Sequence, residues 1–145
     1  MTKKSAQILI IDDNETDSMI MKEALGKVIM GNTITILDNA TDAIDLLNLK
    51  GDFKQSKRPD LMLLDLGMPD FDGFEFLRVI KKDPRFIHIP VIILSASKDP
   101  KEIFKSYKLG ANCFIHKPNN ITKFKQIVAI INEFWLGIAH LPQKD

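Results

Sequence analysis

Residues Arg58–Gly73 read R-P-D-L-M-L-L-D-L-G-M-P-D-F-D-G, an apolar run that ends in an aspartate and a turn. The run Leu61–Leu64 is wholly apolar, which predicts a strand buried on both faces in the middle of a parallel sheet. Asp65 stands at its carboxyl end, and Gly67 and Pro69 then turn the chain. Open α/β sheets bind their ligands at the carboxyl ends of strands. Asp65 is therefore a candidate functional carboxylate, although on its own it could equally be a residue that caps the turn.

Similar apolar runs occur before and after this stretch and alternate with segments of helical spacing. Strands are expected over residues 8–11, 34–37, 91–94 and 112–115. Helices are expected from Glu15 through Val28, from Asn39 or Thr41 to near Gly51, from Phe74 to Ile80, from Asp99-Pro100 to Leu109, and from Thr122 to Leu136. Five strand–helix alternations predict an α/β fold, a doubly wound five-stranded parallel sheet with right-handed crossovers.

The composition is that of an ordinary globular protein. The chain has 145 residues, 45% hydrophobic and 27% charged, with a net charge of +1. This charge gives no argument for a nucleic-acid or membrane partner. The single cysteine, Cys113, fits a reducing compartment, and the N-terminus lacks the apolar region of a signal peptide. We expect a cytoplasmic protein of one domain over residues 1–145, with a core at 7–137, a tail at 138–145 and no output domain.

The ends of four predicted strands carry chemically complementary side chains: Asp12-Asp13, Asp65, Ser95 and Lys117. In a parallel sheet these ends lie on one edge, so the side chains can converge. Carboxylate oxygens suit Mg²⁺, and an aspartate in such a site can act as a nucleophile towards a phosphoryl group. Lys117 could neutralise phosphoryl oxygens and Ser95 could donate a hydrogen bond to them. Each residue alone also has an ordinary structural interpretation; the combination indicates a site.

The same residues carry a family resemblance. The chain resembles the receiver domain of two-component response regulators over nearly its whole length, in the motifs I-D-D at 11–13, L-L-D-L-G-M-P at 63–69, D-G at 72–73, P-V-I-I-L-S-A at 90–96 and L-G-A-N-C-F-I-H-K-P at 109–118. The resemblance implies a flavodoxin-like fold with strand order 2-1-3-4-5. Residues 108–114 and 132–136 more narrowly resemble single-domain receivers associated with phytochrome-type histidine kinases.

The resemblance also implies roles for the metal and phosphoryl site. Asp65 would be the phosphoacceptor. Mg²⁺ would be bound by the carboxylates of Asp13 and Asp65 and the backbone carbonyl of Gly67, with Asp12 acting mostly through water. Lys117 would pair with the phosphoryl group, and the peptide bond between Lys117 and Pro118 would be cis.

Ser95 and Phe114 would form the switch, with Phe114 turning inward as Ser95 moves onto the phosphoryl group. We further expect slow self-dephosphorylation, because neither Gly67 nor Ser97 offers a carboxylate or amide to orient water. His116 is expected to lie on the opposite side of its strand from Lys117 and to play no catalytic part. Cys113 is expected to be a small buried hydrophobic residue.

The predicted function is that of a stand-alone phosphoacceptor in signalling rather than an enzyme. The partner would be a sensor histidine kinase, possibly phytochrome-type, or a phosphotransfer protein. Apolar residues left over from the expected core of the last two helices suggest a homodimer: Ile130, Leu136 and Phe104 or Tyr107.

Three alternatives remain. A phosphorylation-independent binding scaffold would not need the intact site. A Mg²⁺-dependent aspartyl phosphatase would need a second aspartate where Gly67 stands. A DNA-binding regulator would need a concentrated basic helix, which the sequence lacks.

Overall fold

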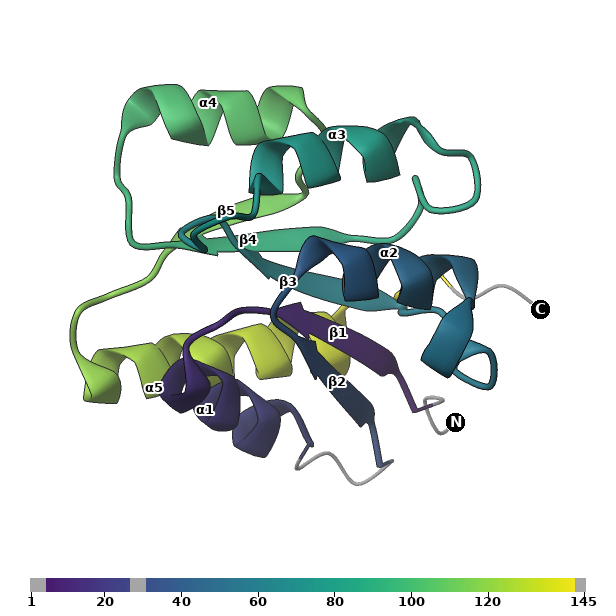
Figure 1. Ribbon diagram of the computed structural model, residues 1–145. Helices are drawn as coiled ribbons and strands as arrows, with labels where there is room; N and C mark the ends of the chain where they lie inside the picture. Colours follow the sequence, from purple (N-terminus) through teal and green to yellow (C-terminus); the bar gives the residue numbers. More distant parts are fainter. Residues whose placement is uncertain (1–4, 27–30, 143–145) are drawn as a thin grey trace.

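The computed structural model describes residues 5–26 and 31–142 and has five parallel strands alternating with five helices (Figure 1). The strands are β1 (Gln7–Ile11), β2 (Thr33–Leu37), β3 (Leu61–Asp65), β4 (Val91–Ser95) and β5 (Cys113–His116). The helices are α1 (Glu15–Gly26), α2 (Ala40–Asn48), α3 (Gly73–Lys82), α4 (Pro100–Lys108) and α5 (Ile121–Ile131), with a 3-10 turn η1 (Gly51–Phe53) and a π-helix η2 (Asn132–Ile138). The strand order β2-β1-β3-β4-β5 confirms the predicted flavodoxin-like sheet.

Alternate side chains of the central strands enter two separate cores. Leu9, Met62 and Ile93 point to the face covered by α2, α3 and α4, whereas Ile10 and Leu63 point to the face covered by α1 and α5 (Figure 1). Every residue of β3 and β4 is buried, as expected for strands in the middle of a parallel sheet. The strands are therefore rigid supports for whatever follows their carboxyl ends.

Short polar side chains cap the starts of the helices, and those of Asn39 and Asp99 do so where the sequence predicts. The side chains of Asn39, Asp72 and Asp99 each accept a hydrogen bond from a backbone N–H in the first turn of α2, α3 and α4. Asn14 does the same for α1 by accepting from the N–H of Asp17 at 2.9 Å. The predicted continuation of α1 to Val28 lies outside the described residues, as do residues 143–145 of the predicted tail.

Two boundary predictions are wrong by a few residues. The second helix ends at Asn48 rather than near Gly51, because Leu49 adopts a left-handed conformation with φ 54°. The last strand begins at Cys113 rather than Asn112, whose side-chain oxygen instead accepts from the N–H of Val91 at 2.9 Å.

The end of the last helix departs from the α-helical spacing. Regular helical spacing in the sequence predicts an apolar core stripe along the last helix that includes Phe134 and leaves Leu136 outside it. The π-helix η2 shifts the later residues around the axis, since its hydrogen bonds join residues five apart. Phe134 is consequently 48% exposed and Leu136 only 9% exposed. Among the described residues no helix is both long and apolar enough to cross a bilayer.

Candidate functional site

Three carboxylates meet at the carboxyl edge of the sheet. Oxygens of Asp12 and Asp13, which follow β1, and of Asp65, which ends β3, all lie within 4.8 Å of one another. Asp12 is 3% exposed and Asp65 9%, while Asp13 is open to solvent. This arrangement confirms that the residues predicted for a cation site converge.

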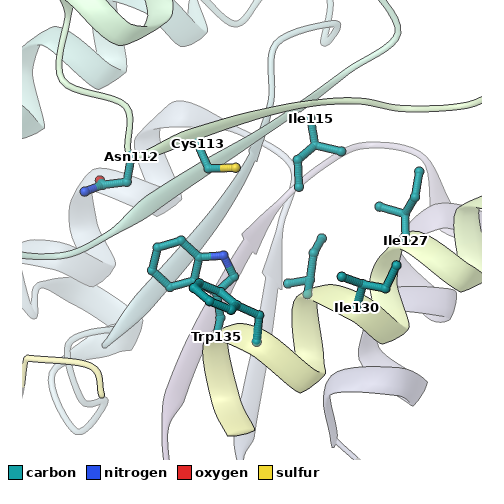
Figure 2. Close-up of a pocket in the computed structure, with 8 residues that line it drawn as sticks. Asn112, Cys113, Ile115, Ile127, Ile130 and Trp135 are labelled. Carbon is teal, nitrogen blue, oxygen red and sulfur yellow. The ribbon is translucent and has the colours of Figure 1, made fainter. Parts of the chain in front are cut away.

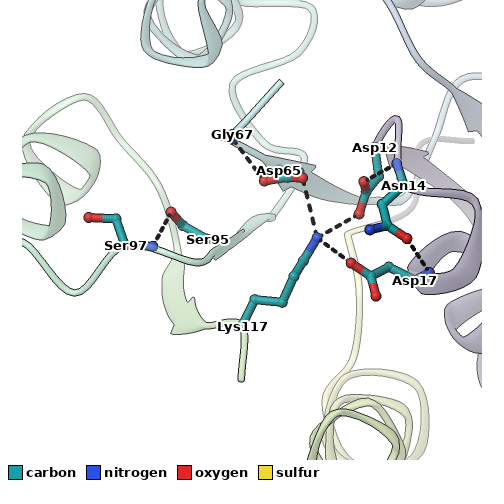
Figure 3. A network of polar contacts seen from close by, with 8 residues as sticks. All are labelled: Asp12, Asn14, Asp17, Asp65, Gly67, Ser95, Ser97 and Lys117. Carbon is teal, nitrogen blue, oxygen red and sulfur yellow. Dashed lines mark hydrogen bonds and ion pairs between the residues drawn. The ribbon is translucent and has the colours of Figure 1, made fainter. Parts of the chain in front are cut away.

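Backbone amides hold two of these carboxylates in place. Oδ1 of Asp12 accepts from the N–H of Asn14 at 2.8 Å, and Oδ1 of Asp65 accepts from the N–H of Gly67 at 2.8 Å (Figure 3). Each bond closes a tight turn two residues after the aspartate, which is how aspartate directs a turn. In both residues Oδ2 remains for another partner.

That partner is Lys117, which follows β5. Its Nζ lies 2.9 Å from Oδ2 of Asp12 and 3.2 Å from Oδ2 of Asp65, and the lysine side chain is 11% exposed (Figure 3). Burial lowers the pKa of Lys117, but hydrogen bonds and charges from the carboxylates outweigh this and raise it above its usual range. The ammonium is therefore a permanent positive charge beside Asp65.

Burial has the largest effect on Asp12 and raises its pKa from 3.8 to about 6, although the N–H of Asn14 and the ammonium of Lys117 act in the opposite direction. The cluster brings the three carboxyl groups of Asp12, Asp13 and Asp65 together with the one ammonium of Lys117. A divalent cation with a preference for oxygen ligands fits this donor set, and Mg²⁺ is the usual choice for one or two carboxylates plus water.

Ser95 ends β4 and is 3% exposed. Its Oγ accepts from the N–H of Ser97 at 3.1 Å (Figure 3). Oγ of Ser97 in turn donates to Glu102 at 2.8 Å. The hydroxyl of Ser95 is thus tied to the start of α4. Phe114 is half-buried on β5 and packs against the core under α4.

The hydroxyl of Tyr107 on α4 accepts a hydrogen bond from the N–H of Phe114 at 3.0 Å. This bond was not foreseen from the sequence. It joins α4 to β5 directly at the residue predicted to act in the switch.

Asp17 is the site residue that the sequence analysis missed. It lies in the first turn of α1 and its Oδ2 is 3.0 Å from Nζ of Lys117 (Figure 3). Its position was available in the sequence: Asn14 caps α1, and a residue three positions after a cap lies in the turn that borders the site.

The predicted cis peptide bond before Pro118 is wrong. The described residues contain no cis peptide bond, so the peptide bond between Lys117 and Pro118 is trans. The side chain of Lys117 contacts Asp12 and Asp65 with the backbone in this form. Trans is the intrinsically favoured form even before proline.

Two further residues of β5 take no part in the site. Nδ1 of His116 is buried and lacks a hydrogen-bond partner, and no polar contact of the described residues connects it to Lys117. Cys113 is half-buried among apolar residues, and burial raises the pKa of its thiol, as expected for an unreactive cysteine.

Comparisons with known proteins point to one family. Residues 8–129 match the model of the response regulator receiver domain. Response regulator Rcp1 of Synechocystis is 35% identical over 93% of this chain and 92% of its own length. The crystal structure of the phosphorylated cyanobacterial phytochrome response regulator RcpA superimposes with a TM-score of 0.91 at 39% identity, covering 96% of this chain and 99% of that one. The Mn²⁺-bound form of Rcp1 gives a TM-score of 0.90 at 34% identity, over 95% and 99% of the two chains.

Proposed function

This chain belongs to the response regulator receiver family, and on that premise we propose that it accepts a phosphoryl group on Asp65 from a sensor histidine kinase. The observation that carries the proposal is the contact between Lys117 and Asp65 beside the carboxylate triad. This arrangement places a nucleophilic oxygen, a fixed positive charge and a candidate cation site together at the carboxyl edge of the sheet. A phosphorylated structure of a 39% identical receiver, RcpA, adds support.

The proposed reaction is a phosphoryl transfer in which Asp65 provides the attacking oxygen. A new O–P bond forms as the N–P bond of a phosphohistidine breaks, and the histidine nitrogen keeps the electron pair of that bond. Lys117 contacts one phosphoryl oxygen, and the hydroxyl of Ser95 donates a hydrogen bond to another. Mg²⁺ would be held by Asp12, Asp13, Asp65 and the backbone carbonyl of Gly67, and would supply positive charge to offset that of the phosphoryl group.

The proposed switch follows from the attachments of Ser95. When its hydroxyl turns to the phosphoryl group, it leaves the N–H of Ser97 and so loosens the start of α4. Phe114 then turns inward, and the face formed by α4, β5 and α5 changes. Phosphorylation would act by shifting the populations of two conformations, as in other switches of this kind.

The kinase partner is proposed to be phytochrome-type. Support comes from RcpA, which is described as a cyanobacterial phytochrome response regulator. We also propose that the protein works in the cytoplasm. A phosphotransfer protein in place of the kinase would use the same site chemistry.

We propose that the face formed by α4, β5 and α5 is also where two copies associate. It presents exposed apolar side chains, among them Phe104 (70% exposed) and Ile130 (63%). Beside them lies a hollow of about 310 Å³ between β5 and the last helix, which Cys113, Ile127 and Trp135 help to line (Figure 2). Apolar surface of this kind supports a protein interface. Size-exclusion chromatography before and after phosphorylation tests whether association of two copies depends on phosphorylation.

The phosphoryl group is proposed to be long-lived. Gly67 has no side chain, and the hydroxyl of Ser97 already donates to Glu102. Neither residue is therefore available to orient a water molecule against phosphorus. A half-life of seconds for the purified phosphoprotein would contradict this part of the proposal.

Mass spectrometry of the intact protein tests the function. The protein is incubated with acetyl phosphate and Mg²⁺, alongside Asp65→Asn and a matched control, Asp52→Asn, at an exposed aspartate of η1. We expect a phosphoryl mass gain in the wild type and the control and none in Asp65→Asn. No gain from acetyl phosphate or from a kinase, together with no Mg²⁺ binding, would favour the scaffold alternative. Steady release of phosphate from varied phosphomonoesters would favour the phosphatase.

A further inference from the structure

Lys117 donates to more carboxylates than the proposed phosphoryl transfer requires. Its Nζ lies 2.9 Å from Asp12, 3.0 Å from Asp17 and 3.2 Å from Asp65. An ammonium group has three N–H donors, so each donor has its own carboxylate. Asp17 is the one of these three acceptors that lies outside the triad predicted to bind the cation.

The backbone of Asp17 is fixed by a hydrogen bond of its N–H group. The N–H of Asp17 donates to Oδ1 of Asn14, and the N–H of Asn14 donates to Oδ1 of Asp12. Lys117 then joins Oδ2 of Asp12 to Oδ2 of Asp17, so these four residues form a closed ring of polar contacts (Figure 3). The cap of α1 therefore fixes the backbone of Asp17 next to the site, and the carboxylate of Asp17 lies within reach of Lys117 from that position.

The other two acceptors have competing roles. In the proposed function the carboxylate of Asp65 becomes an acyl phosphate, whose negative charge lies on the phosphoryl oxygens, and Asp12 shares its oxygens with the cation. Asp17 has neither role, and Lys117 is the cation that lies within ion-pair distance of it among the described residues. Its hold on the ammonium thus persists through the reaction.

We propose that Asp17 is a positioning residue that keeps the ammonium of Lys117 at the place where the phosphoryl oxygens arrive. The inference rests on the proposed function, because it assigns a role within that same site. A lysine side chain has many rotamers, and holding it in one of them has an entropic cost that Asp17 offsets before the donor binds. Asp12 by itself accepts only one of the three N–H donors of the Lys117 ammonium, which leaves that group free to rotate.

The test compares Asp17→Asn with Glu15→Gln, which removes the same charge from the same turn of α1 at an exposed side chain that makes no ion pair with Lys117. The rate constant for phosphorylation by acetyl phosphate is measured at saturating Mg²⁺. We expect Asp17→Asn to lower it about tenfold, in the range found for residues that orient a catalytic group. Glu15→Gln should stay within about twofold of the wild type, since it changes only the long-range charge.

A second readout separates positioning from a general loss of structure. The ¹⁵N signal of the Lys117 ammonium should be narrow and protected from exchange in the wild type and broadened in Asp17→Asn, with the backbone amide spectrum otherwise unchanged. A rate for Asp17→Asn within about twofold of the wild type would overturn the inference. So would a slower rate with an unaltered ammonium signal, because Asp17 would then act by another route.

The two proposals fail differently. If the wild type takes up no phosphoryl group from any donor, the proposed function fails and Asp17 has no reaction to assist. If the wild type is phosphorylated and Asp17→Asn reacts equally well, the function stands and the inference about Asp17 is wrong.

Discussion

Replacing Asp12 by asparagine should stabilise the protein when divalent cations are absent. The carboxylate is 3% exposed and burial raises its pKa from 3.8 to about 6, so ionising it in the folded protein is unfavourable. A shift of about two pKa units corresponds to roughly 3 kcal/mol of folding free energy. Asparagine keeps an oxygen acceptor for the N–H of Asn14, but its NH₂ group needs a new partner, which reduces the expected gain to about 2 kcal/mol.

The pH dependence follows from the direction of the shift. Because the folded pKa of Asp12 is above the unfolded one, this residue favours folding below about pH 4, and the benefit is lost as the pH rises through about 6. The variant should therefore match the wild type near pH 4 and exceed it at neutral pH.

The assay is urea unfolding in EDTA, followed by circular dichroism from about pH 4 to 8. With a urea m-value of about 2 kcal/mol/M, a gain of about 2 kcal/mol would raise the urea concentration at the unfolding midpoint by about 1 M. Adding Mg²⁺ should remove the advantage, because binding stabilises the wild type more than a variant that lacks one carboxylate. A variant less stable than the wild type in EDTA at neutral pH, or a gain that is independent of pH, would refute the reasoning.

Three further predictions concern stability and the proposed interface. Gly110→Ala should cost about 2–4 kcal/mol in urea unfolding, because Gly110 has φ +107° and a Cβ there would lie 2.7 Å from Cγ of Lys81; a loss below about 1 kcal/mol would show that the loop adapts. Tyr107→Phe should cost about 1 kcal/mol and speed hydrogen exchange at the amide of Phe114, which loses its acceptor; unchanged exchange at that amide would contradict the contact. Ile130→Glu should leave the folded monomer intact, since the side chain is 63% exposed, and should abolish any dimer seen by size-exclusion chromatography; a dimer that persists would place the interface elsewhere.

Much of the fold could be predicted because its signals are local. An apolar run such as Leu61–Leu64, followed at once by an aspartate and turn residues, specifies a buried strand and its end without knowledge of the rest. Caps such as Asp99 before Pro100 fix helix starts in the same way. The convergence of Asp12, Asp65 and Lys117 then follows from the geometry of parallel strands alone.

Two features could not be predicted: the burial pattern of the π-helix, which depends on a change of helical period, and the role of Asp17, which depends on a contact distant in sequence. The π-helix that exposes Phe134 and buries Leu136 cannot be recognised by spacing rules that assume α-helical turns. Asp17 is one of two acidic residues in the first turn of α1, and only the fold of the chain about a hundred residues later makes it a partner of Lys117.

The full burial of β3 and β4 has a consequence for how such a protein can vary. Their interior residues are constrained by packing on both faces, so substitutions there reduce stability before they change chemistry. The segments after the strands are different, since Gly67 is exposed and Ser97 is half-buried, and both border the site. Single substitutions in these loops can therefore change the rates of the proposed phosphorylation and dephosphorylation while the sheet that supports the site stays the same.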